Sequence, residues 1–493
     1  MTYICTRTKK RVSSAQAILQ GLSPAGGLYV KEQLPRATAD MLPFAPGVSY
    51  AQRAAAVLKL FFPDLPAERL DEIAQASYRR FDDPRIAPVT MTDDKTALLE
   101  LYHGPTLAFK DMALQMLPRL IRLAADEAKE GREIAILTAT SGDTGKAALE
   151  GFQDVPGTSC TVFYPLDGVS RLQQRQMVTS AGQNTHVIAV RGNFDDAQTG
   201  VKAIFGDRAF AEALDRKGIV LSSANSINIG RLVPQVAYYF SAYSDLVNEG
   251  RLSPGDTLDV CVPTGNFGDI LAAWYARHMG LPLGRLICAS NRNQVLTDFI
   301  NTGVYDIRRP FHKTISPSMD ILISSNLERL LFELTGRDEK ALSGLMAQLK
   351  TEGRYELPRE ALSGLQEEFA GFYADDDATR LMISRTWEKA GVLSDPHTAV
   401  GLCALSQYRA QTGSDRLTLV NATASPFKFA QDVGAAIGLA PGEDALGDAF
   451  RQAEKTGLKL PEAIASLRSA PVRHTAVTEI SDMPRAVLSA LGA

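Results

Sequence analysis

One lysine of this chain, Lys110, stands where its amine could attack a carbonyl compound. It follows Phe109 and opens a stretch, continuing to Ala124, whose apolar residues recur at helical spacing. A lysine in the first helical turn opposes the helix dipole, and an aromatic neighbour adds desolvation, so both lower the pKa of the amine. A neutral amine forms Schiff bases with carbonyl compounds. Lys110 is therefore the candidate catalytic residue, although a lone lysine is more often a solvated surface group.

Two further segments combine glycine with polar residues and are typical of anion-binding turns. Residues 262–269 (VPTGNFGD) lie between an apolar run and an apolar helical stretch. Glycines there let backbone amides approach an anion, and the helix dipole favours negative charge at the same place. Residues 138–146 (TATSGDTGK) crowd hydroxyl groups and amides at a second predicted helix start. Each segment alone is also compatible with a tight turn or a helix cap.

The second of these segments is not a nucleotide-triphosphate loop. That motif needs a glycine five residues before its Gly-Lys pair, and Ser or Thr after the lysine. This chain has Thr140 and Ala147 at the two positions. The segment therefore indicates a carboxylate or a simple phosphate as its ligand.

Composition excludes several classes of function. The 493 residues exceed the roughly 250–300 at which one hydrophobic core stops growing, so at least two packed units are expected. A net charge of -4 gives no basic field for nucleic acid. The five cysteines are scattered singly, which argues against a zinc site or a disulfide framework and favours a reducing compartment. Without a long apolar stretch or a signal-like N-terminus, a cytoplasmic protein is expected, with no membrane partner.

The anion-binding segments need a scaffold, and from about residue 99 the chain alternates short apolar runs with amphipathic stretches. This alternation predicts an α/β fold with parallel strands joined by helices. Ligands of such sheets bind in loops that follow the strands. Strands are predicted at 134–138, 160–164, 186–190, 219–222, 258–262 and 416–420, and helices at 146–152, 231–247 and 268–279.

The rest of the chain lacks that regular alternation. Residues 1–98 are predicted to form a separate N-terminal unit of mixed structure. Residues 327–390 are rich in Glu, Lys, Arg and Leu at helical spacing, which predicts a helical insertion covering the core. A further helix is expected to begin near Phe427, and residues 441–493 to form a surface cap. The part between the two ends is divided into a first α/β subdomain, 99–240, and a second one, 241–440.

Taken together, the motifs resemble those of threonine synthases, which are fold-type II pyridoxal-phosphate enzymes. Several blocks in the expected order are far more specific than any single glycine loop, and they extend over nearly the whole chain. They are 21–29 (GLSPAGGLY), 103–111 (HGPTLAFKD), 141–145 (SGDTG), 223–235 (SANSINIGRLVPQ), 265–269 (GNFGD), 395–400 (DPHTAV) and 423–429 (TASPFKF).

The resemblance implies a pyridoxal 5'-phosphate enzyme with two doubly wound sheet domains, in which Lys110 carries the cofactor as a Schiff base. It also implies that the hydroxyl of Thr423 faces the pyridine nitrogen. The residues implied to hold the cofactor phosphate are Gly265, Asn266, Phe267, Gly268 and Asp269. The residues implied to bind the substrate are Thr140, Ser141, Gly142, Asp143 and Thr144 for its carboxylate, and Asn225, Asn228 and Arg231 for its phosphate.

Two positions depart from the wider pattern. Many fold-type II relatives have Asn where this chain has Asp143, although threonine synthases commonly have Asp. The late block usually reads Thr-Ala-His-Pro, whereas here Ser425 replaces the histidine and Phe427 a small residue. Any role of that histidine is lost in this chain.

The implied reaction converts O-phospho-L-homoserine and water to L-threonine and phosphate, by γ-elimination followed by addition of water at the β carbon. A phospho-lyase that releases 2-oxobutyrate would use the same residues and stays open as an alternative. A dehydratase is less consistent, because it needs no phosphate-binding group. A non-catalytic cofactor-binding homologue is the alternative from another class. The expected partner is a small-molecule substrate, and the expected state is a monomer.

Overall fold

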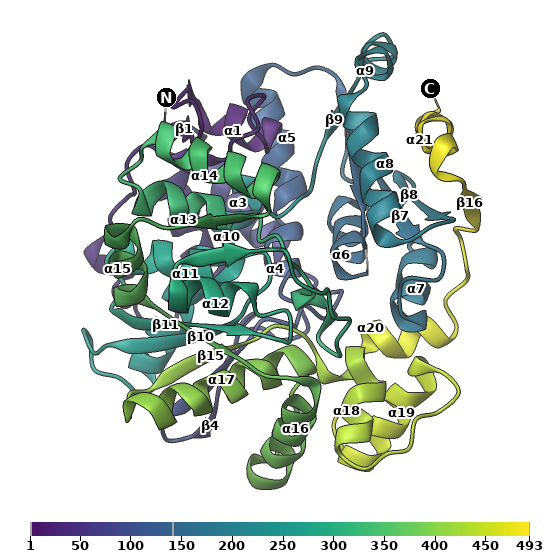
Figure 1. Ribbon diagram of the computed structural model, residues 1–493. Helices are drawn as coiled ribbons and strands as arrows, with labels where there is room; N and C mark the ends of the chain where they lie inside the picture. The colour runs from purple at the N-terminus through teal and green to yellow at the C-terminus, as the bar shows by residue number, and fades with distance from the viewer. Residues whose placement is uncertain (1, 141, 493) are drawn as a thin grey trace.

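The computed structural model describes residues 2–140 and 142–492, and these form two mainly parallel sheets that stand side by side (Figure 1). The larger sheet has six strands in the order β14-β11-β10-β15-β5-β4, and all neighbours are parallel except β4 and β5. This arrangement confirms the predicted α/β class. The strands are β4 (Val89–Asp93), β5 (Thr96–Glu100), β10 (Leu258–Pro263), β11 (Leu283–Ser290), β14 (Phe369–Tyr373) and β15 (Thr418–Ala422).

The smaller sheet has five parallel strands in the order β16-β8-β7-β6-β9. It occupies the other half of the molecule, to the right in Figure 1. Its strands are β6 (Glu133–Ala139), β7 (Thr158–Pro165), β8 (Thr185–Val190), β9 (Ile219–Ser222) and β16 (Ala476–Thr478).

Helices cover both faces of each sheet, as a doubly wound fold requires. On β10, Val260 and Val262 belong to the core on the side of α11, whereas Cys261 between them faces α17 on the other side. This alternation follows from the two-residue period of a strand. The smaller sheet lies between α6 and α8. The covering helices are α6 (Asp143–Phe152), α8 (Phe194–Gly206), α11 (Gly268–His278), α12 (Val295–Thr302) and α17 (Pro396–Thr412).

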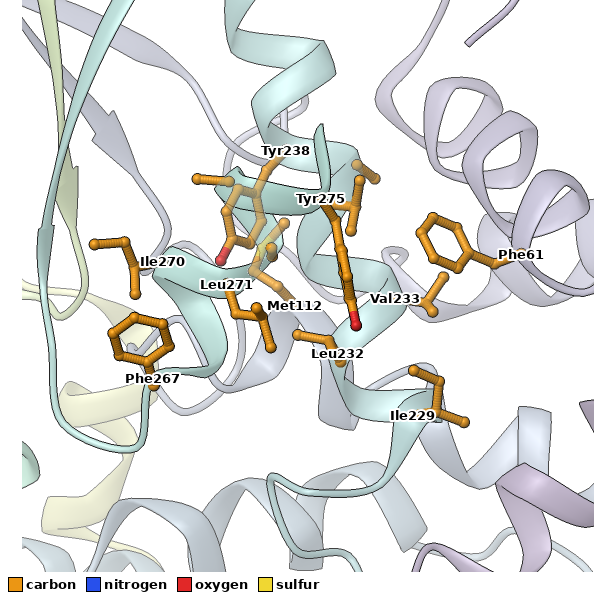
Figure 2. Close-up of a cluster of buried hydrophobic side chains, with 14 of the residues drawn as sticks. Phe61, Met112, Ile229, Leu232, Val233, Tyr238, Phe267, Ile270, Leu271 and Tyr275 are labelled. Atoms are coloured by element: carbon orange, nitrogen blue, oxygen red, sulfur yellow. The ribbon is translucent and has the colours of Figure 1, made fainter. Parts of the chain in front are cut away.

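The N-terminal part packs on the long helix α10 (Ile229–Asn248). Arg53 on α2 pairs with Asp245 on α10 at 2.6 Å, and the hydroxyl of Tyr3 donates to the carbonyl of Phe61 at 2.8 Å. Figure 2 shows the apolar core in which these helices meet beside α11. The N-terminal elements are β1 (Tyr3–Cys5), β2 (Arg11–Val12), α1 (Ser14–Gln20), β3 (Tyr29–Lys31), η1 (Ala39–Met41), α2 (Tyr50–Phe61) and α3 (Ala67–Ser77).

All predicted strands and helices between residues 134 and 279 are confirmed as β6, α6, β7, β8, β9, α10, β10 and α11, with shifts of a few residues at their ends. The predicted strand at 416–420 is β15, two residues further on. The single helix expected after Lys110 is instead two, α4 (Asp111–Leu114) and α5 (Leu117–Ala128). Pro118 lies in the first turn of α5, where its missing N–H removes no helical hydrogen bond, so a new helix starts there.

The expected helical insertion at 327–390 is only partly correct. It contains helices, but its β14 segment (FAGFY) is an edge strand of the larger sheet, paired with β11. Aromatic residues favour a strand there, and the charged helices on either side obscured that signal. The other elements between residues 304 and 390 are β12 (Val304–Asp306), η2 (Pro317–Met319), α13 (Leu327–Leu334), α14 (Glu339–Glu352), β13 (Arg354–Glu356), α15 (Arg359–Glu368) and α16 (Asp376–Ala390).

The C-terminal residues are also more than a surface cap. Strand β16 extends the smaller sheet beside β8, and α21 buries Met483 and Val487 against it. The helix expected near Phe427 begins as the short turn η3. The elements not yet given are α7 (Arg171–Val178), α9 (Arg208–Asp215), η3 (Pro426–Phe429), α18 (Ala430–Ala436), α19 (Ala445–Thr456), α20 (Glu462–Ala465), η4 (Ser466–Arg468), η5 (Ile480–Asp482) and α21 (Met483–Leu491).

Sheet membership does not change at the expected division after residue 98. Strand β5 runs across that position, and β4 and β5 both belong to the larger sheet. The division of the chain into domains stays a prediction. None of the helices in the described part of the chain combines the length and apolar character needed to cross a membrane.

Candidate active site

Lys110 lies at the start of α4, where the chain turns against the end of β15. The amide of Phe109 donates to the carbonyl of Thr423 at 2.8 Å, and the amide of Ser425 donates to that of Leu107 at 3.0 Å. These bonds join two segments that are distant in the sequence. They place the predicted catalytic lysine beside the predicted cofactor residue Thr423, which is itself buried.

The amine of Lys110 is surrounded by polar and charged groups. Its Nζ donates to Oδ2 of Asp143 and to Oγ of Ser318, both at 3.3 Å, and it lies 5.0 Å from the centre of the Phe109 ring. Burial lowers the pKa of Lys110 most strongly. The carboxylate of Asp143 opposes this shift, while the positive charges of Lys428 and Arg231 reinforce it. The lysine thus meets the requirement for a reactive amine that the sequence suggested.

Asp143 is the centre of the charged cluster. Its Oδ1 pairs with Nζ of Lys428 at 2.8 Å and accepts from Nε2 of Gln173 at 2.9 Å. Burial opposes its ionisation, but Lys428 and Lys110 hold the pKa of the carboxyl well below its usual range. Asp143 therefore links two lysines, in addition to lying in the loop predicted to bind a carboxylate.

The loop before Asp143 is shaped by Thr140. Its Oγ1 accepts from the amides of Gly142 and Gly145, both at 3.0 Å, so the oxygen predicted to bind substrate also braces the loop. Gly142 has a φ of +145°, and a Cβ there would lie 2.4 Å from the side chain of Gln173. Thr144 is half-buried in the first turn of α6, whereas Ser141 lies outside the described residues. The substrate roles in this loop stay predictions.

The glycine loop at 265–269 leads into α11 with its amides available. Within the described residues, the backbone amides of residues 265–270 donate to no backbone carbonyl. The next amide, that of Leu271, donates to the carbonyl of Phe267. Phe267 has a φ of +61°, and α11 begins at Gly268. The carbonyl of Asn266 accepts from the backbone amide and from Nδ2 of Asn326. Consecutive free amides at a helix start fit a phosphate group, as expected for the cofactor.

Gly265 needs its small size because another loop passes close to it. A Cβ there would lie 2.8 Å from the carbonyl oxygen of Ser318. The glycine loop is therefore packed against the same residue that contacts Lys110. This proximity brings the predicted phosphate cradle and the predicted Schiff-base lysine into one site.

Asp269 does not direct its carboxylate toward the cradle. Its Oδ1 accepts from the hydroxyls of Tyr238 and Tyr239 and from Nδ2 of Asn421, at 2.9 Å for the last. Burial raises the pKa of this carboxyl. Its side chain belongs to the core behind the loop, so only its backbone amide remains as a phosphate ligand. A carboxylate facing the phosphate would repel it, so this orientation is compatible with the predicted cradle, and the role of Asp269 as a phosphate ligand stays a prediction.

The three residues predicted for the substrate phosphate have different surroundings. Asn225 is exposed and accepts from the amide of Ile227 at 3.2 Å. Asn228 is buried and caps α10, with Oδ1 accepting from the amide of Gly230 and Nδ2 donating to the carbonyl of Ile18. These bonds use both polar atoms of the Asn228 side chain to stabilise the fold, so its substrate role stays a prediction.

Arg231 is the best placed of the three. It is buried, and its Nη1 donates to the carbonyl of Ala224 at 2.9 Å. Its Nε has no hydrogen-bond acceptor among the described residues. Burial lowers its pKa to about 10. A buried cation with a free donor fits an anionic ligand, and its charge reaches Lys110.

Sequence reasoning missed Lys428, Gln173 and Ser318 in this cluster. Lys428 lies within the block 423–429, which was quoted for its resemblance without assigning the lysine a role. Gln173 and Ser318 stand in segments without any motif, so no local signal was available. Lys110 and Lys428 both contact the carboxylate of Asp143, and the charge of Arg231 also acts on Lys110, so this excess of positive charge suits an anionic ligand.

No group of residues suited to holding a metal ion occurs in the described ranges. The donors that are present fit a phosphorylated carbonyl compound. Lys110 supplies a buried amine of lowered pKa, and the backbone amides of residues 265–270 donate to no backbone carbonyl among the described residues. A Cβ at Gly265 would lie 2.8 Å from the carbonyl oxygen of Ser318, so the loop keeps its shape only with glycine there.

Comparison with known protein families gives three matches along the chain. Residues 2–78 match the model described as "Threonine synthase N terminus", residues 96–423 match "Pyridoxal-phosphate dependent enzyme", and residues 398–487 match "Threonine synthase, C-terminal".

Individual proteins resemble the chain over its length. The threonine synthase of Pseudomonas aeruginosa is 39% identical over 478 residues, which cover 96% of this chain and 98% of that protein. Threonine synthase-like 1 of Homo sapiens is 39% identical over 449 residues, and the match spans 87% of this chain but only 60% of that longer protein.

Solved structures agree with these matches. A threonine synthase from Brucella melitensis with bound pyridoxal phosphate has a TM-score of 0.89 and 37% identity, with both chains fully covered. The threonine synthase from yeast has a TM-score of 0.89 and 32% identity, covering 100% of this chain and 99% of that one.

Proposed function

The chain belongs to the threonine synthase family of fold-type II pyridoxal-phosphate enzymes, and on this premise we propose that it converts O-phospho-L-homoserine and water to L-threonine and phosphate. Its cofactor is pyridoxal 5'-phosphate. The observation that carries the proposal is the buried amine of Lys110, 3.3 Å from Asp143, under the influence of the charge of Arg231 and beside the Ser318 loop that packs on the glycine loop.

Lys110 would hold the cofactor through its Nζ and, when its amine is free, would move protons at the α and β carbons of the substrate. When bound, the cofactor supplies an electron sink that stabilises negative charge at these carbons. Because burial lowers its pKa, the neutral form of Lys110 that a base requires is more accessible than in a surface lysine. Asp143 orients the amine through its 3.3 Å contact.

Different backbone and side-chain donors bind the two phosphate groups. The amides of residues 265–269 hold the cofactor phosphate at the start of α11, where the helix dipole adds to their effect. Arg231 binds the phosphate that leaves the substrate, through the Nε that has no acceptor within the described residues. Thr423, whose carbonyl accepts from the amide of Phe109, would offer a neutral hydroxyl to the cofactor ring, and such a partner does not enforce ring protonation.

The substrate carboxylate binds to the loop at 140–144. The φ of +145° at Gly142 and the brace from Thr140 present this loop at the start of α6, where negative charge is favoured. The charge of Asp143 is balanced by Lys428 at 2.8 Å, so the loop does not repel an incoming carboxylate as a free aspartate would. Asn225, exposed at the entrance of α10, completes the contacts to the phosphate end.

The test uses purified protein supplied with the cofactor. Wild-type protein is expected to show the visible absorbance of a lysine Schiff base, and to produce threonine and phosphate in equal amounts from O-phospho-L-homoserine. Lys110→Ala is expected to lose both the absorbance and the products, while Lys459→Ala, at an exposed position outside the site, keeps both.

Two results would change the conclusion. Phosphate with 2-oxobutyrate in place of threonine would assign the phospho-lyase reaction. Schiff-base absorbance without turnover of the substrate would assign a cofactor-binding protein without this activity.

The remaining expectations also belong to this proposal. The enzyme works as a cytoplasmic monomer, and its five cysteines, all buried and free, are consistent with a reducing compartment. Light scattering on the purified protein tests the monomeric state, since a dimer would double the mass of 53.3 kDa.

A further inference from the structure

Ser318 contacts the reactive amine but has no role in the function proposed so far. It lies in η2, within a long loop between β12 and α13. Its Oγ accepts from Nζ of Lys110 at 3.3 Å and donates to Oδ2 of Asp143 at 3.0 Å. Because the hydroxyl has one proton, and that proton is directed to Asp143, its lone pairs face the amine of Lys110.

The backbone of Ser318 is held by a buried histidine. The amide of Ser318 donates to Nε2 of His397 at 3.1 Å. An amide can only donate, so Nε2 must be unprotonated and the ring hydrogen lies on Nδ1. That nitrogen lies 2.6 Å from Oδ2 of Asp395, which accepts its hydrogen. His397 is thus a neutral ring in one fixed tautomer.

This histidine is itself rigidly supported. The side chains of His397 and Asp395 are 3% and 0% exposed. Asp395 caps α17 by accepting from the amides of His397 and Thr398. The ring of His397 also packs edge-on against Phe429, with 4.9 Å between ring centres. The pair therefore cannot move without disturbing the start of α17.

The other side of Ser318 is fixed by the glycine loop. Its carbonyl oxygen lies where a Cβ on Gly265 would approach within 2.8 Å. Ser318 is consequently wedged between three parts of the site: the phosphate cradle, the reactive lysine and the carboxylate of Asp143. A residue held on three sides, with its hydroxyl at the amine, is preorganised rather than incidental.

We propose that Ser318 is a further catalytic residue, whose hydroxyl and Asp143 together hold the free amine of Lys110 in the orientation for proton transfer, and that the Asp395–His397 pair positions Ser318 through its backbone amide. This inference rests on the function proposed above for Lys110. No net bond change occurs at Ser318, because its hydroxyl keeps its proton in the bond to Asp143 and only accepts from the amine.

The first experiment compares Ser318→Ala with Ser318→Thr in the holoenzyme. Removal of the hydroxyl is expected to lower kcat about tenfold, with KM changed less than about twofold, since the bond acts on the amine rather than on substrate binding. Threonine keeps a hydroxyl and is expected to restore most of kcat. Equal loss in both variants would mean that the loop is disturbed and would overturn the proposal, as would unchanged kcat in Ser318→Ala.

A second readout does not need turnover. The cofactor is removed, and the rate at which Schiff-base absorbance returns on adding pyridoxal phosphate is measured against pH. Ser318 accepts a hydrogen bond that favours the protonated amine, so its loss is expected to shift this pH profile to lower pH. Asp143, Lys428 and Arg231 face the same amine and remain in both proteins, so they do not account for a difference. An unshifted profile in Ser318→Ala contradicts the proposal.

The positioning role of His397 has its own test. His397→Leu removes the acceptor for the Ser318 amide, whereas His397→Gln keeps an acceptor at that place. The leucine variant is expected to lower kcat, and combining it with Ser318→Ala should add little, because both act through one hydroxyl. Fully additive losses would refute this role. If His397→Leu fails to fold, the test uses the two conservative variants, Ser318→Thr and His397→Gln. Low kcat in both of these variants, when they are folded, would refute the positioning role equally.

These outcomes are distinct from a failure of the proposed function. If wild-type protein makes no threonine from O-phospho-L-homoserine, the reaction assignment fails in that assay alone. The pH profile of Schiff-base formation still decides whether Ser318 acts on Lys110.

Discussion

Gly151 on α6 packs tightly against the end of α4. Helix α4 follows Lys110 directly, and α6 begins at Asp143. A Cβ added at Gly151 would lie 2.0 Å from the carbonyl oxygen of Leu114, the last residue of α4. We predict that Gly151→Ala separates these helices and thereby misplaces the amine relative to its carboxylate.

The magnitude follows from this distance. A carbon normally touches a carbonyl oxygen at about 3.3 Å, so the contact at 2.0 Å requires a displacement of about 1.3 Å. The carbonyl of Leu114 is backbone and cannot rotate away as a side chain would. Overpacking of this kind costs about 1–3 kcal/mol, and the better helix propensity of alanine offsets about 0.5–1 kcal/mol. The difference is a net loss of up to about 2.5 kcal/mol in unfolding free energy, and a misplacement of about 1 Å is expected to lower kcat/KM about a hundredfold.

Gly344→Ala is the matched control. Gly344 also lies inside a helix, α14, but it is exposed and nothing lies within 4 Å of a Cβ added there. The same substitution should therefore raise stability slightly, by about 0.5–1 kcal/mol, and leave activity unchanged. Urea unfolding followed by tryptophan fluorescence measures the first quantity, and threonine formation measures the second.

One result would refute the reasoning about Gly151. If Gly151→Ala is stabilised to the same degree as Gly344→Ala and keeps its kcat/KM, then α4 and α6 do not approach each other as closely as described. Lower stability with full activity would retain the close contact but would separate it from the geometry of Lys110 and Asp143.

Two further predictions concern buried charge. Arg329 is fully buried and donates to the carbonyls of Tyr29 and Ile227 and to Oδ1 of Asn326. Arg329→Met leaves these acceptors unpaired and should lower the free energy of unfolding by at least about 3 kcal/mol. The control is Arg485→Met, at a side chain 86% exposed, and equal urea midpoints for the two variants would contradict the prediction. Burial opposes the charge of His103, but hydrogen bonds to Asp82 and Glu100 raise its pKa from 6.5 to about 9. The folded protein thus binds this proton more tightly than the unfolded chain, so its contribution to stability is complete below about pH 6.5 and is lost as the pH rises through about 9. The urea midpoint should fall over this range in wild type and fall less in His103→Gln; parallel curves would refute the assignment.

The elements around the site were predictable because their signals are local. Apolar runs of strand length before glycine-rich or hydroxyl-rich turns predicted β6, β10 and the helices that follow them. The role of Lys110 was predicted from its neighbours and stays a prediction, whereas the order of the motifs indicated the family, which is confirmed. Even the error at β14 has a local cause, since five residues of strand stand between charged helices and give a weak signal.

The sequence by itself determined which loops carry polar residues and glycine, because backbone freedom, hydroxyl groups and hydrophobic period are properties of neighbouring residues. Only the tertiary structure decided which of these residues meet. Asp143 and Ser318 are 175 positions apart, yet the hydroxyl of Ser318 donates to Oδ2 of Asp143 at 3.0 Å. The carboxylate of Asp269 turns into the core although it lies in the predicted phosphate loop. Such contacts depend on how two sheets pack against each other. Burial, pKa shifts and hydrogen-bond partners follow from that packing, and no local period of the chain encodes it.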